Sequence, residues 1–298
     1  MDIIESSKNE QIKYISKLLK SSKFRREERA FVIEGPRMVS EAPSDLIQKV
    51  YVSESFFSEF QNSFYEKFDF QIVSDSVMKS ISDTVNPKGI LALVSFPEEK
   101  DFLSERNNHP VLFLETIQDP GNLGTIFRTA EAAGARGIVM SADTVDVFSP
   151  KVTRATMGGI FRMPFIIAGT EPKDGDEPED DSTGSDLAEK KDFYEILRNF
   201  VEGRFLDSEA KEASTNIVLF GAALGATHHY DEIDYSSLEN GFGFLIGNEG
   251  NGLSERALSL CTEKIIIPME GKIESLNAAV SASLLMYEAK RQRDKASK

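Results

Sequence analysis

The sequence predicts an α/β protein of two domains, in which short strands alternate with helices. Apolar runs typical of strands alternate with helical patterns over residues 30–96, and the same alternation returns over residues 111–290. A chain of 298 residues is also longer than one typical domain. Near the end of the chain, the apolar runs in Phe244–Glu255 and Ile265–Asn277 stop at loops rich in glycine and polar residues. Open α/β sheets bind ligands at such strand ends, so these two loops predict one composite site.

The first domain is expected over residues 1–97. A helix over residues 11–20 places Ile12, Ile15, Leu18 and Leu19 at helical spacing, with lysines on the opposite face. A basic connector follows, and the stretch FVIEGPR then predicts a short strand turning into a helix. The remaining predicted elements are strand 49–53, helix 56–67, strand 71–74, helix 75–82 and strand 89–96. Residues 98–110 are polar and charged, as a linker would be.

The second domain is expected over residues 111–298 and begins with the strand Val111–Glu115. A helix follows from about Asn122, a residue suited to cap it. The next predicted elements are strand 137–140, helix 150–157, strand 163–168, helix 192–202 and strand 216–222. A last helix over residues 276–290 is expected to bury Leu276, Val280, Leu284 and Tyr287, which share helical spacing. Strands that alternate with helices in this way predict a mainly parallel sheet covered on both faces.

The charge of the chain is unevenly distributed. The net charge is −15, but residues 171–192 hold ten acidic and three basic residues, a net of −7. Their composition predicts a flexible surface loop. Residues 11–29 hold seven basic and two acidic residues, a net of +5, and residues 287–298 hold five basic and two acidic residues, a net of +3. The basic segments could therefore meet a polyanion while the acidic tract stays away from it, although lysines on a helix are also typical of a solvated face.

Composition argues against several classes of protein. The N-terminus lacks the apolar segment of a signal peptide, and no apolar run is long enough to cross a membrane, so we expect a cytoplasmic protein. The single cysteine, Cys261, excludes an internal disulfide framework and fits a reducing compartment. With His109, His228 and His229 as the histidines, we expect no metal site. The adjacent pair could hold a metal ion, but after a glycine loop it is more typical of a solvated turn.

A polar tract follows the first strand of the second domain. Asp119-Pro120-Gly121 breaks the strand, Asn122 comes next, and Arg128 lies six residues further on. By themselves these residues fit a helix cap and a surface arginine. The glycines of this tract do not follow the G-x-G-x-x-G order, so a dinucleotide site is poorly supported.

Three ordered tracts resemble the motifs of the SpoU (TrmH-like) RNA ribose 2′-O-methyltransferases of the SPOUT superfamily. They are Asp119–Asn122 with Arg128, then Gly247–Gly252, then Ile267–Met269 with Ser275–Asn277. The resemblance covers residues 111–294. The first domain, including the stretches FVIEGPR and GILALV, resembles the L30e-like substrate-binding domain that many members carry.

The resemblance implies a deep trefoil knot, a rare exception among protein folds, whose loops hold S-adenosylmethionine. The cofactor-binding residues that it implies are Gly247, Ile267, Leu276, Met269 and Leu224. Ile267 and Leu276 could equally be core residues, and both interpretations can hold for the wall of a pocket.

The resemblance also implies ribose 2′-O-methylation, with catalytic residues Asn122, Arg128, Glu249, Ser275 and Asn277. The family implicates the arginine as the base that removes the 2′-hydroxyl proton. Because arginine is effectively always protonated, orienting that hydroxyl and a neighbouring phosphate is the physically safer role for Arg128.

The expected partners are RNA and a second copy of the chain. The residues expected to contact RNA are Lys13, Lys17, Lys20, Lys23, Arg25, Arg26 and Arg37. Ribosomal RNA is favoured over tRNA, because of the L30e-like domain. Family members dimerise through helices near the knot, and Phe127, Phe161 and the last helix offer apolar surface here. Arg128 could then serve the partner subunit's site. A non-catalytic RNA-binding or ribosome-assembly protein of the same fold, and a methyltransferase acting on bases, are the alternatives.

Overall fold

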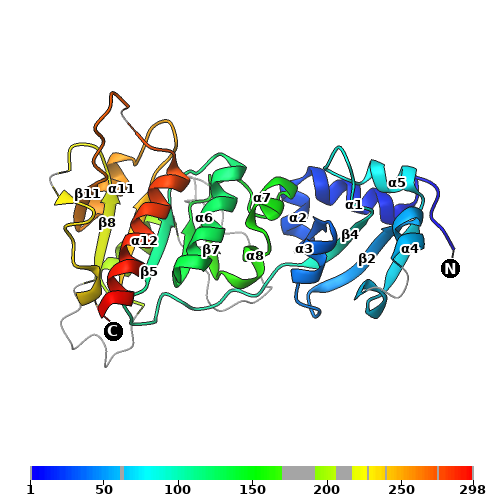
Figure 1. Cartoon of the computed structure of the whole chain (residues 1–298), viewed down its shortest axis with the longest axis horizontal. Coiled ribbons are helices and arrows are strands. Elements are labelled where there is room, and N and C mark those ends of the chain that lie inside the picture. The colour runs from blue at the N-terminus through cyan, green and yellow to red at the C-terminus, as the bar shows by residue number, and fades with distance from the viewer. Residues whose placement is uncertain are drawn as a thin grey trace, which may run out of the picture. The chain divides into compact units, whose positions relative to one another are not determined.

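The protein consists of two compact units (Figure 1). The computed structural model describes residues 2–60, 64–169, 192–205, 217–226, 228–238, 240–273 and 275–296. The first unit comprises Met1–Glu98 and Asp146–Arg162, and the second comprises Glu99–Val145 and Met163–Lys298. The chain therefore passes from one unit to the other three times. Residues 146–162, which we expected in the second domain, pack within the first unit.

A four-stranded sheet forms the centre of the first unit. Its order is β1 (Ala30–Glu34), β4 (Ile90–Ser95), β2 (Ile47–Ser53) and β3 (Phe70–Val73). Strand β4 runs antiparallel to β1 and β2, and β3 runs parallel to β2. The helices are α1 (Glu10–Lys20), α2 (Ser22–Glu28), α3 (Pro36–Glu41), α4 (Glu54–Glu59), α5 (Asp75–Ser80) and the 3₁₀ helix η1 (Phe64–Lys67). The helix expected over residues 56–67 is thus α4 and η1, with residues 61–63 outside the described residues.

The basic connector that we expected after α1 is the helix α2. Ser21 caps its N-terminus by accepting a hydrogen bond from the Phe24 N–H, and Arg29 ends it in the left-handed conformation, with φ of 46°. A serine beside a helix start is a strong cap, but the run of charged residues that follows masked this signal.

The two faces of the first sheet are covered by different parts of the chain. On one face, Ile12, Ile15 and Leu18 of α1 pack against alternate residues of the strands. Phe31 belongs to the other face, where its ring lies 5.1 Å from the ring of Phe148 and 6.1 Å from that of Phe161. Both partners come from the segment 146–162, which forms the helices α7 (Pro150–Thr156) and α8 (Gly159–Arg162).

Ion pairs fasten the same segment to the first unit. The Arg25 guanidinium of α2 binds the Asp146 carboxylate, and both side chains are largely buried. Arg154 of α7 binds Asp83 at 2.7 Å. The first unit is therefore completed by a segment from further along the chain. About 50 residues separate its start at Asp146 from Glu98, where the first part of the unit ends.

A seven-stranded sheet forms the centre of the second unit, and every paired strand in it is parallel. Its order is β7 (Phe165–Ile167), β6 (Gly137–Met140), β5 (Pro110–Leu114), β10 (Phe242–Ile246), β8 (Val218–Ala222), β11 (Glu263–Ile266) and β9 (His228–His229). The predicted parallel sheet is confirmed. The deep knot that the resemblance implies stays a prediction, and the expected acidic loop lies outside the described residues except for Asp192.

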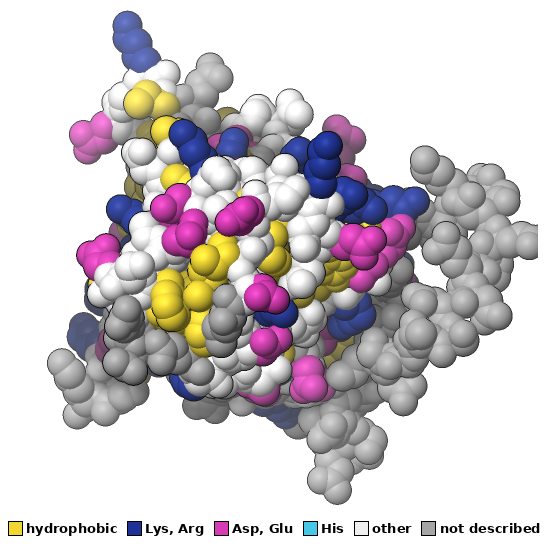
Figure 2. Space-filling model, turned by 90° about the vertical axis from the view of Figure 1, so that its right-hand side faces the viewer, with side chains coloured by type: hydrophobic (Ala, Val, Ile, Leu, Met, Phe, Trp, Pro, Cys, Tyr) yellow, Lys and Arg dark blue, Asp and Glu magenta, His cyan; other side chains and the backbone are white. Residues whose placement is uncertain are grey.

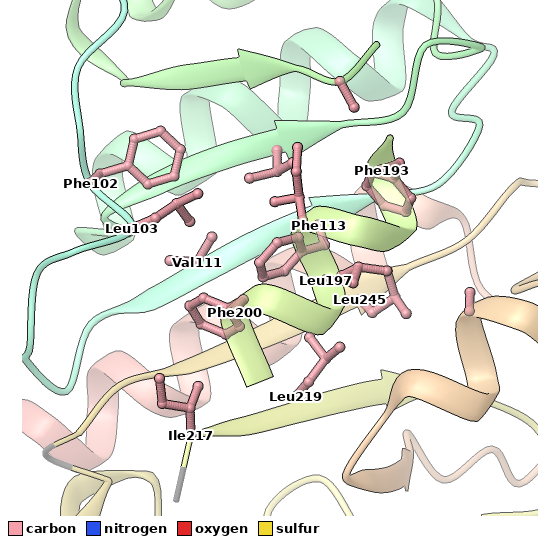
Figure 3. Packing of buried hydrophobic residues seen from close by; sticks show 14 residues of the cluster. Phe102, Leu103, Val111, Phe113, Phe193, Leu197, Phe200, Ile217, Leu219 and Leu245 are labelled. Carbon is pink, nitrogen blue, oxygen red and sulfur yellow. The ribbon is translucent and has the colours of Figure 1, made fainter. Parts of the chain in front are cut away.

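Helices cover both faces of this sheet. They are α6 (Pro120–Ala133), α9 (Phe193–Val201), α11 (Glu255–Leu260) and α12 (Ala278–Ala296), with the 3₁₀ helix η2 (Tyr235–Ser237). Figure 3 shows α9 on one face, where Phe193, Leu197 and Phe200 pack against residues of β5, β8 and β10. The helices α6 and α12 pack against each other, and α12 also contacts β10. None of the described helices combines the length and the apolar character needed to cross a membrane.

The prediction for the inward face of the last helix is wrong. Val280 is 46% exposed, Leu284 36% and Tyr287 49%, while Leu276 precedes the helix. The buried residues are instead small or lie on another face: Ala278, Ala279, Ala282, Leu285, Met286 and Ala289. Alanines allow the helix to approach its neighbours closely, while Val280, Leu284 and Tyr287 form an apolar stripe on the exposed face.

Candidate active site

A cavity of about 420 Å³ lies at the carboxyl ends of β8, β10 and β11. Its walls come from the loops that follow these strands and from the start of α12. All five residues expected to bind the cofactor line it: Leu224, Gly247, Ile267, Met269 and Leu276. The two strand ends that predict a composite site are therefore brought together, as the parallel sheet requires.

Gly247 allows the first of these loops to fold back on itself. A Cβ atom at this position would lie 2.3 Å from the main-chain carbon of Gly252 and 2.4 Å from the Leu253 nitrogen. No larger residue fits without moving the backbone. Asn248 and Gly252 close the loop with two main-chain hydrogen bonds of 3.0 and 2.9 Å. The loop thus presents main-chain groups to the cavity in a fixed arrangement.

A chain of side-chain hydrogen bonds connects the three motifs. The Asn122 Nδ2 donates to Glu249 Oε1 at 2.9 Å, and the Asn277 Nδ2 donates to Asn122 Oδ1 at 2.9 Å. Asn277 also caps α12, because its Oδ1 accepts from the main-chain nitrogens of Ala279 and Val280. Three polar side chains from distant parts of the sequence are thereby held beside the cavity.

We had expected Asn122 to cap α6, but the structure shows that it does not. The cap is Asp119, whose carboxylate accepts a hydrogen bond of 2.8 Å from the Asn122 main-chain N–H. Pro120 then occupies the first turn, where its missing N–H costs nothing. Because Asp119 serves as the cap, the Asn122 amide is available for Glu249 and Asn277.

The surroundings of Glu249 keep its carboxylate charged. Partial burial alone would raise the pKa of this group, but hydrogen bonds from Asn122 and from main-chain N–H groups outweigh it, so the pKa lies below its usual value. The main-chain donors include Asp119 at 3.1 Å and Gln118 at 3.2 Å. A charged acceptor forms stronger hydrogen bonds than a neutral one, so Glu249 fixes both its own loop and the start of α6.

The predicted catalytic residues are only partly brought together. Ser275 is exposed and lines the cavity, close in sequence to Asn277. Arg128 is an exposed residue of α6 and does not line the cavity. Six residues along a helix rotate a side chain well away from the direction of Asn122. Within the described part of the chain, Arg128 has no hydrogen-bond or ion-pair partner.

Most of the predicted RNA-binding residues lie on the surface of the first unit. Lys13, Lys17, Lys20, Lys23, Arg26 and Arg37 are exposed. Arg25 is 5% exposed and paired with Asp146, so we remove it from this set. Lys17, Lys20, Lys23 and Phe24 line a hollow of about 460 Å³ on α1 and α2. Figure 2 shows an apolar area near the centre of the facing side, with acidic side chains around it and Lys and Arg side chains interspersed with them and gathered above it.

Sequence reasoning missed one buried carboxylate, that of Glu115. It is 4% exposed and accepts hydrogen bonds from Tyr194 and Ser254. Its only signal in the sequence is its place at the end of an apolar run. Among the described residues, no group of three or more His, Cys, Asp or Glu side chains is placed to hold a metal ion.

Comparison with known proteins agrees with this geometry. A model of the SpoU rRNA Methylase family matches residues 109–179 and 188–287, and one of the MRM3-like substrate binding domain matches residues 9–92. The 23S rRNA (guanosine(2553)-2′-O)-methyltransferase RlmP of Bacillus subtilis is 28% identical over 96% of this chain and 98% of its own. The mitochondrial rRNA methyltransferase 3 of Xenopus laevis is 28% identical over 92% of this chain and 72% of its own.

A solved structure shares the whole fold. The AdoMet-bound rRNA methyltransferase of Sinorhizobium meliloti has a TM-score of 0.72 and 25% identity, covering 97% of each chain. A parallel sheet whose carboxyl-end loops enclose a cavity beside a chain of polar side chains is the site of an α/β enzyme. The chain belongs to the SpoU rRNA methylase family, whose model matches more than half of its residues.

Proposed function

We propose that this protein transfers a methyl group from S-adenosylmethionine to a ribose 2′-hydroxyl of ribosomal RNA. The observation that carries the proposal is the hydrogen-bonded chain Asn277–Asn122–Glu249, which lies beside the cavity and joins all three motifs. The names of the relatives favour rRNA over tRNA, since both RlmP and the Xenopus protein are rRNA methyltransferases.

The cavity suits S-adenosylmethionine in size and in chemistry. A volume of about 420 Å³ is in the range of small-molecule sites, and its walls combine apolar side chains with main-chain groups. Main-chain N–H and C=O groups in the loops after Gly247 and Ile267 can read the edge of an adenine. Leu224, which is 66% exposed at the cavity, offers apolar contact to the base. When bound, the cofactor would supply the electrophilic methyl group.

The protein must orient the ribose hydroxyl and accommodate the proton that it loses as the oxygen–carbon bond forms. The Asn277 amide is fixed by its cap contacts, and the Asn122 amide by Asn277 and Glu249. Such preorganised dipoles hold a polar substrate group without reorganising during the reaction. Arg128 would bind the neighbouring phosphate and stabilise the developing alkoxide.

We infer that Arg128 performs this role in the cavity of a second subunit. It does not line its own cavity, and Val280, Leu284 and Tyr287 form an exposed apolar stripe on α12, the helix that packs against α6. Burying this stripe against a second copy would remove apolar surface from water and carry the exposed α6 arginine to the partner's site. We therefore include a homodimer in the proposal. Phe127 cannot contribute to its interface, because it is fully buried.

The basic surface of α1 and α2 is proposed to bind the RNA backbone. A variant with Lys17, Lys20 and Lys23 all changed to Ala should bind an rRNA transcript at least about tenfold more weakly, and the slope of log K against log salt should fall by about 2. Fluorescence anisotropy across a salt series measures both.

The control for this variant removes the same charge at the exposed residues Lys100, Lys151 and Lys264. An equal loss of affinity in the control would mean that the first three lysines contribute only to net charge. An unchanged salt slope in the test variant would place the RNA elsewhere.

The proposed activity is tested by incubating the purified protein with labelled S-adenosylmethionine and rRNA. We expect label in RNA, and nuclease digestion should yield a 2′-O-methylated nucleotide. Label on a base would exclude the ribose assignment. Cofactor and RNA binding without any transfer would favour the non-catalytic alternative. Transfer to tRNA alone would mean that the substrate is tRNA and not rRNA.

A further inference from the structure

The Glu115 carboxylate is buried at the end of β5 and accepts three hydrogen bonds. The Tyr194 hydroxyl donates to it at 2.8 Å, the Ser254 hydroxyl at 2.6 Å and the Ser254 main-chain N–H at 2.8 Å. Burial raises the pKa of Tyr194, and the bond to Glu115 acts in the same direction, so the phenol stays a donor. Within the described part of the chain, Glu115 forms no ion pair. Burying a carboxylate that only neutral groups hydrogen-bond costs free energy, because its charge is removed from water. A neutral side chain at this position would avoid that cost.

The position of this carboxylate relates it to the cavity loop. The Glu115 main-chain N–H donates to the Ile246 carbonyl at 2.9 Å. Ile246 is the residue before Gly247, and Ser254 is the residue after Leu253, where the loop 247–253 ends. One residue thus holds both ends of the loop, by its main chain at the start and by its side chain at the finish. Residues 247–253 all line the cavity.

The next residue adds a third attachment. Thr116 has φ of 58°, a conformation that β-branched residues rarely adopt. Its N–H donates to the Ser141 hydroxyl at 2.8 Å, and its carbonyl accepts from the Asn248 side chain at 2.8 Å. Unfavourable backbone conformations persist where the surrounding structure enforces them, commonly at functional sites. Here the residue next to Glu115 adopts the left-handed conformation, and its carbonyl accepts a hydrogen bond from the loop.

We propose that Glu115 is a positioning residue for the cofactor, setting the separation of the two ends of the loop 247–253. It does not line the cavity, so its effect on the cofactor passes through the loop. The inference rests on the proposed function, because it takes S-adenosylmethionine as the ligand of this cavity. A loop held at both ends offers its main-chain groups already placed, which lowers the ordering cost of binding.

The test compares the Glu115→Gln variant with the unsubstituted chain. Glutamine keeps the shape of the side chain but loses the charge and presents N–H donors, one of which must face a hydroxyl or the Ser254 N–H. We expect the Kd for S-adenosylmethionine, measured by calorimetry, to rise about tenfold. The KM for the cofactor should rise in parallel, while kcat at saturating cofactor stays within about threefold of wild type.

The matched control is Glu34→Gln in the first unit. Glu34 also accepts from two hydroxyls and one main-chain N–H, those of Ser82, Thr84 and Asp83, but it does not line or bracket the cavity. Its cofactor Kd should equal that of wild type. Tyr194→Phe removes one donor and keeps the carboxylate, so the Kd should rise about two- to fourfold. If Glu115→Gln does not fold, the cofactor Kd of Tyr194→Phe tests the positioning role by itself.

The outcomes separate the two proposals. If wild type binds S-adenosylmethionine and both variants at the Glu115 network bind it within twofold of wild type, the positioning role is refuted and the proposed function stands. A fall in kcat at saturating cofactor with unchanged KM would also refute it. If wild type itself does not bind S-adenosylmethionine, the proposed function fails first.

Discussion

Replacing Arg128 with Ala should lower methyl transfer by about 10²- to 10³-fold while leaving the Kd for S-adenosylmethionine within about twofold of wild type. The reason is its position: Arg128 is exposed on α6 and lies outside the cavity. Its removal leaves no buried group without a partner, so the free energy of unfolding should change by less than about 0.5 kcal/mol. Single-turnover transfer, calorimetry and urea unfolding measure the three quantities.

Arg198→Ala is the matched control, since Arg198 is an exposed arginine of α9 in the same unit. It should transfer methyl groups at the wild-type rate. If Arg128→Ala lost cofactor binding and transfer equally, its role would be structural. If transfer were unaffected, another cation would have to hold the phosphate.

Mixed dimers decide whether Arg128 serves the partner's cavity. Arg128→Ala and a variant that cannot bind the cofactor should each be inactive alone. Mixed and allowed to exchange subunits, they form a dimer in which one cavity is intact and receives an intact arginine from the other chain. Restored transfer supports the proposed homodimer, and no restoration with proven exchange would place Arg128 in its own subunit's site.

Replacing Gly247 with Ala should weaken S-adenosylmethionine binding by roughly 100-fold, equivalent to about 3 kcal/mol. The added Cβ would lie 2.3 Å from a main-chain atom of Gly252, and main-chain atoms cannot rotate away as a flexible side chain can. The loop must open, and the groups that it presents to the cavity move with it. Calorimetry measures the affinity, and circular dichroism checks that the sheet still forms.

Gly271→Ala is the corresponding control. A Cβ there would meet nothing closer than 4.0 Å, and Gly271 does not line the cavity. Its affinity for the cofactor should match that of wild type. A Kd for Gly247→Ala within about threefold of wild type would show that the loop adapts, and that the close approach to Gly252 has no part in binding.

Strand positions were predictable from the sequence, because each buried strand is a short apolar run that ends at glycine, proline or a polar residue. Val111–Glu115 and β5 differ by one residue at each end, and the prediction placed the cavity loops correctly. Helix faces were harder to predict. Val280, Leu284 and Tyr287 have the spacing of a core stripe, yet the helix buries alanines such as Ala282.

Side-chain partners distant in sequence could not be predicted from spacing. Glu115 and Ser254 are 139 residues apart, and nothing in the local sequence of either indicates the other. Arg25 lies in the most basic stretch of the chain and resembles its neighbours, but its partner Asp146 is 121 residues away. Charge density predicts a surface, while burial depends on contacts that only the folded chain reveals.

The interleaved order of the two units limits how such a protein can be recombined. Phe148 and Phe161 cover Phe31 from within the stretch that the methylase family model matches. In a chimera that takes only residues 1–98 from a relative, the sheet of the first unit would come from the relative. Phe148 and Phe161, which pack on that sheet, would still come from this chain. The two units are therefore not independent modules, and a functional exchange of the first unit must carry residues 146–162 together with residues 1–98.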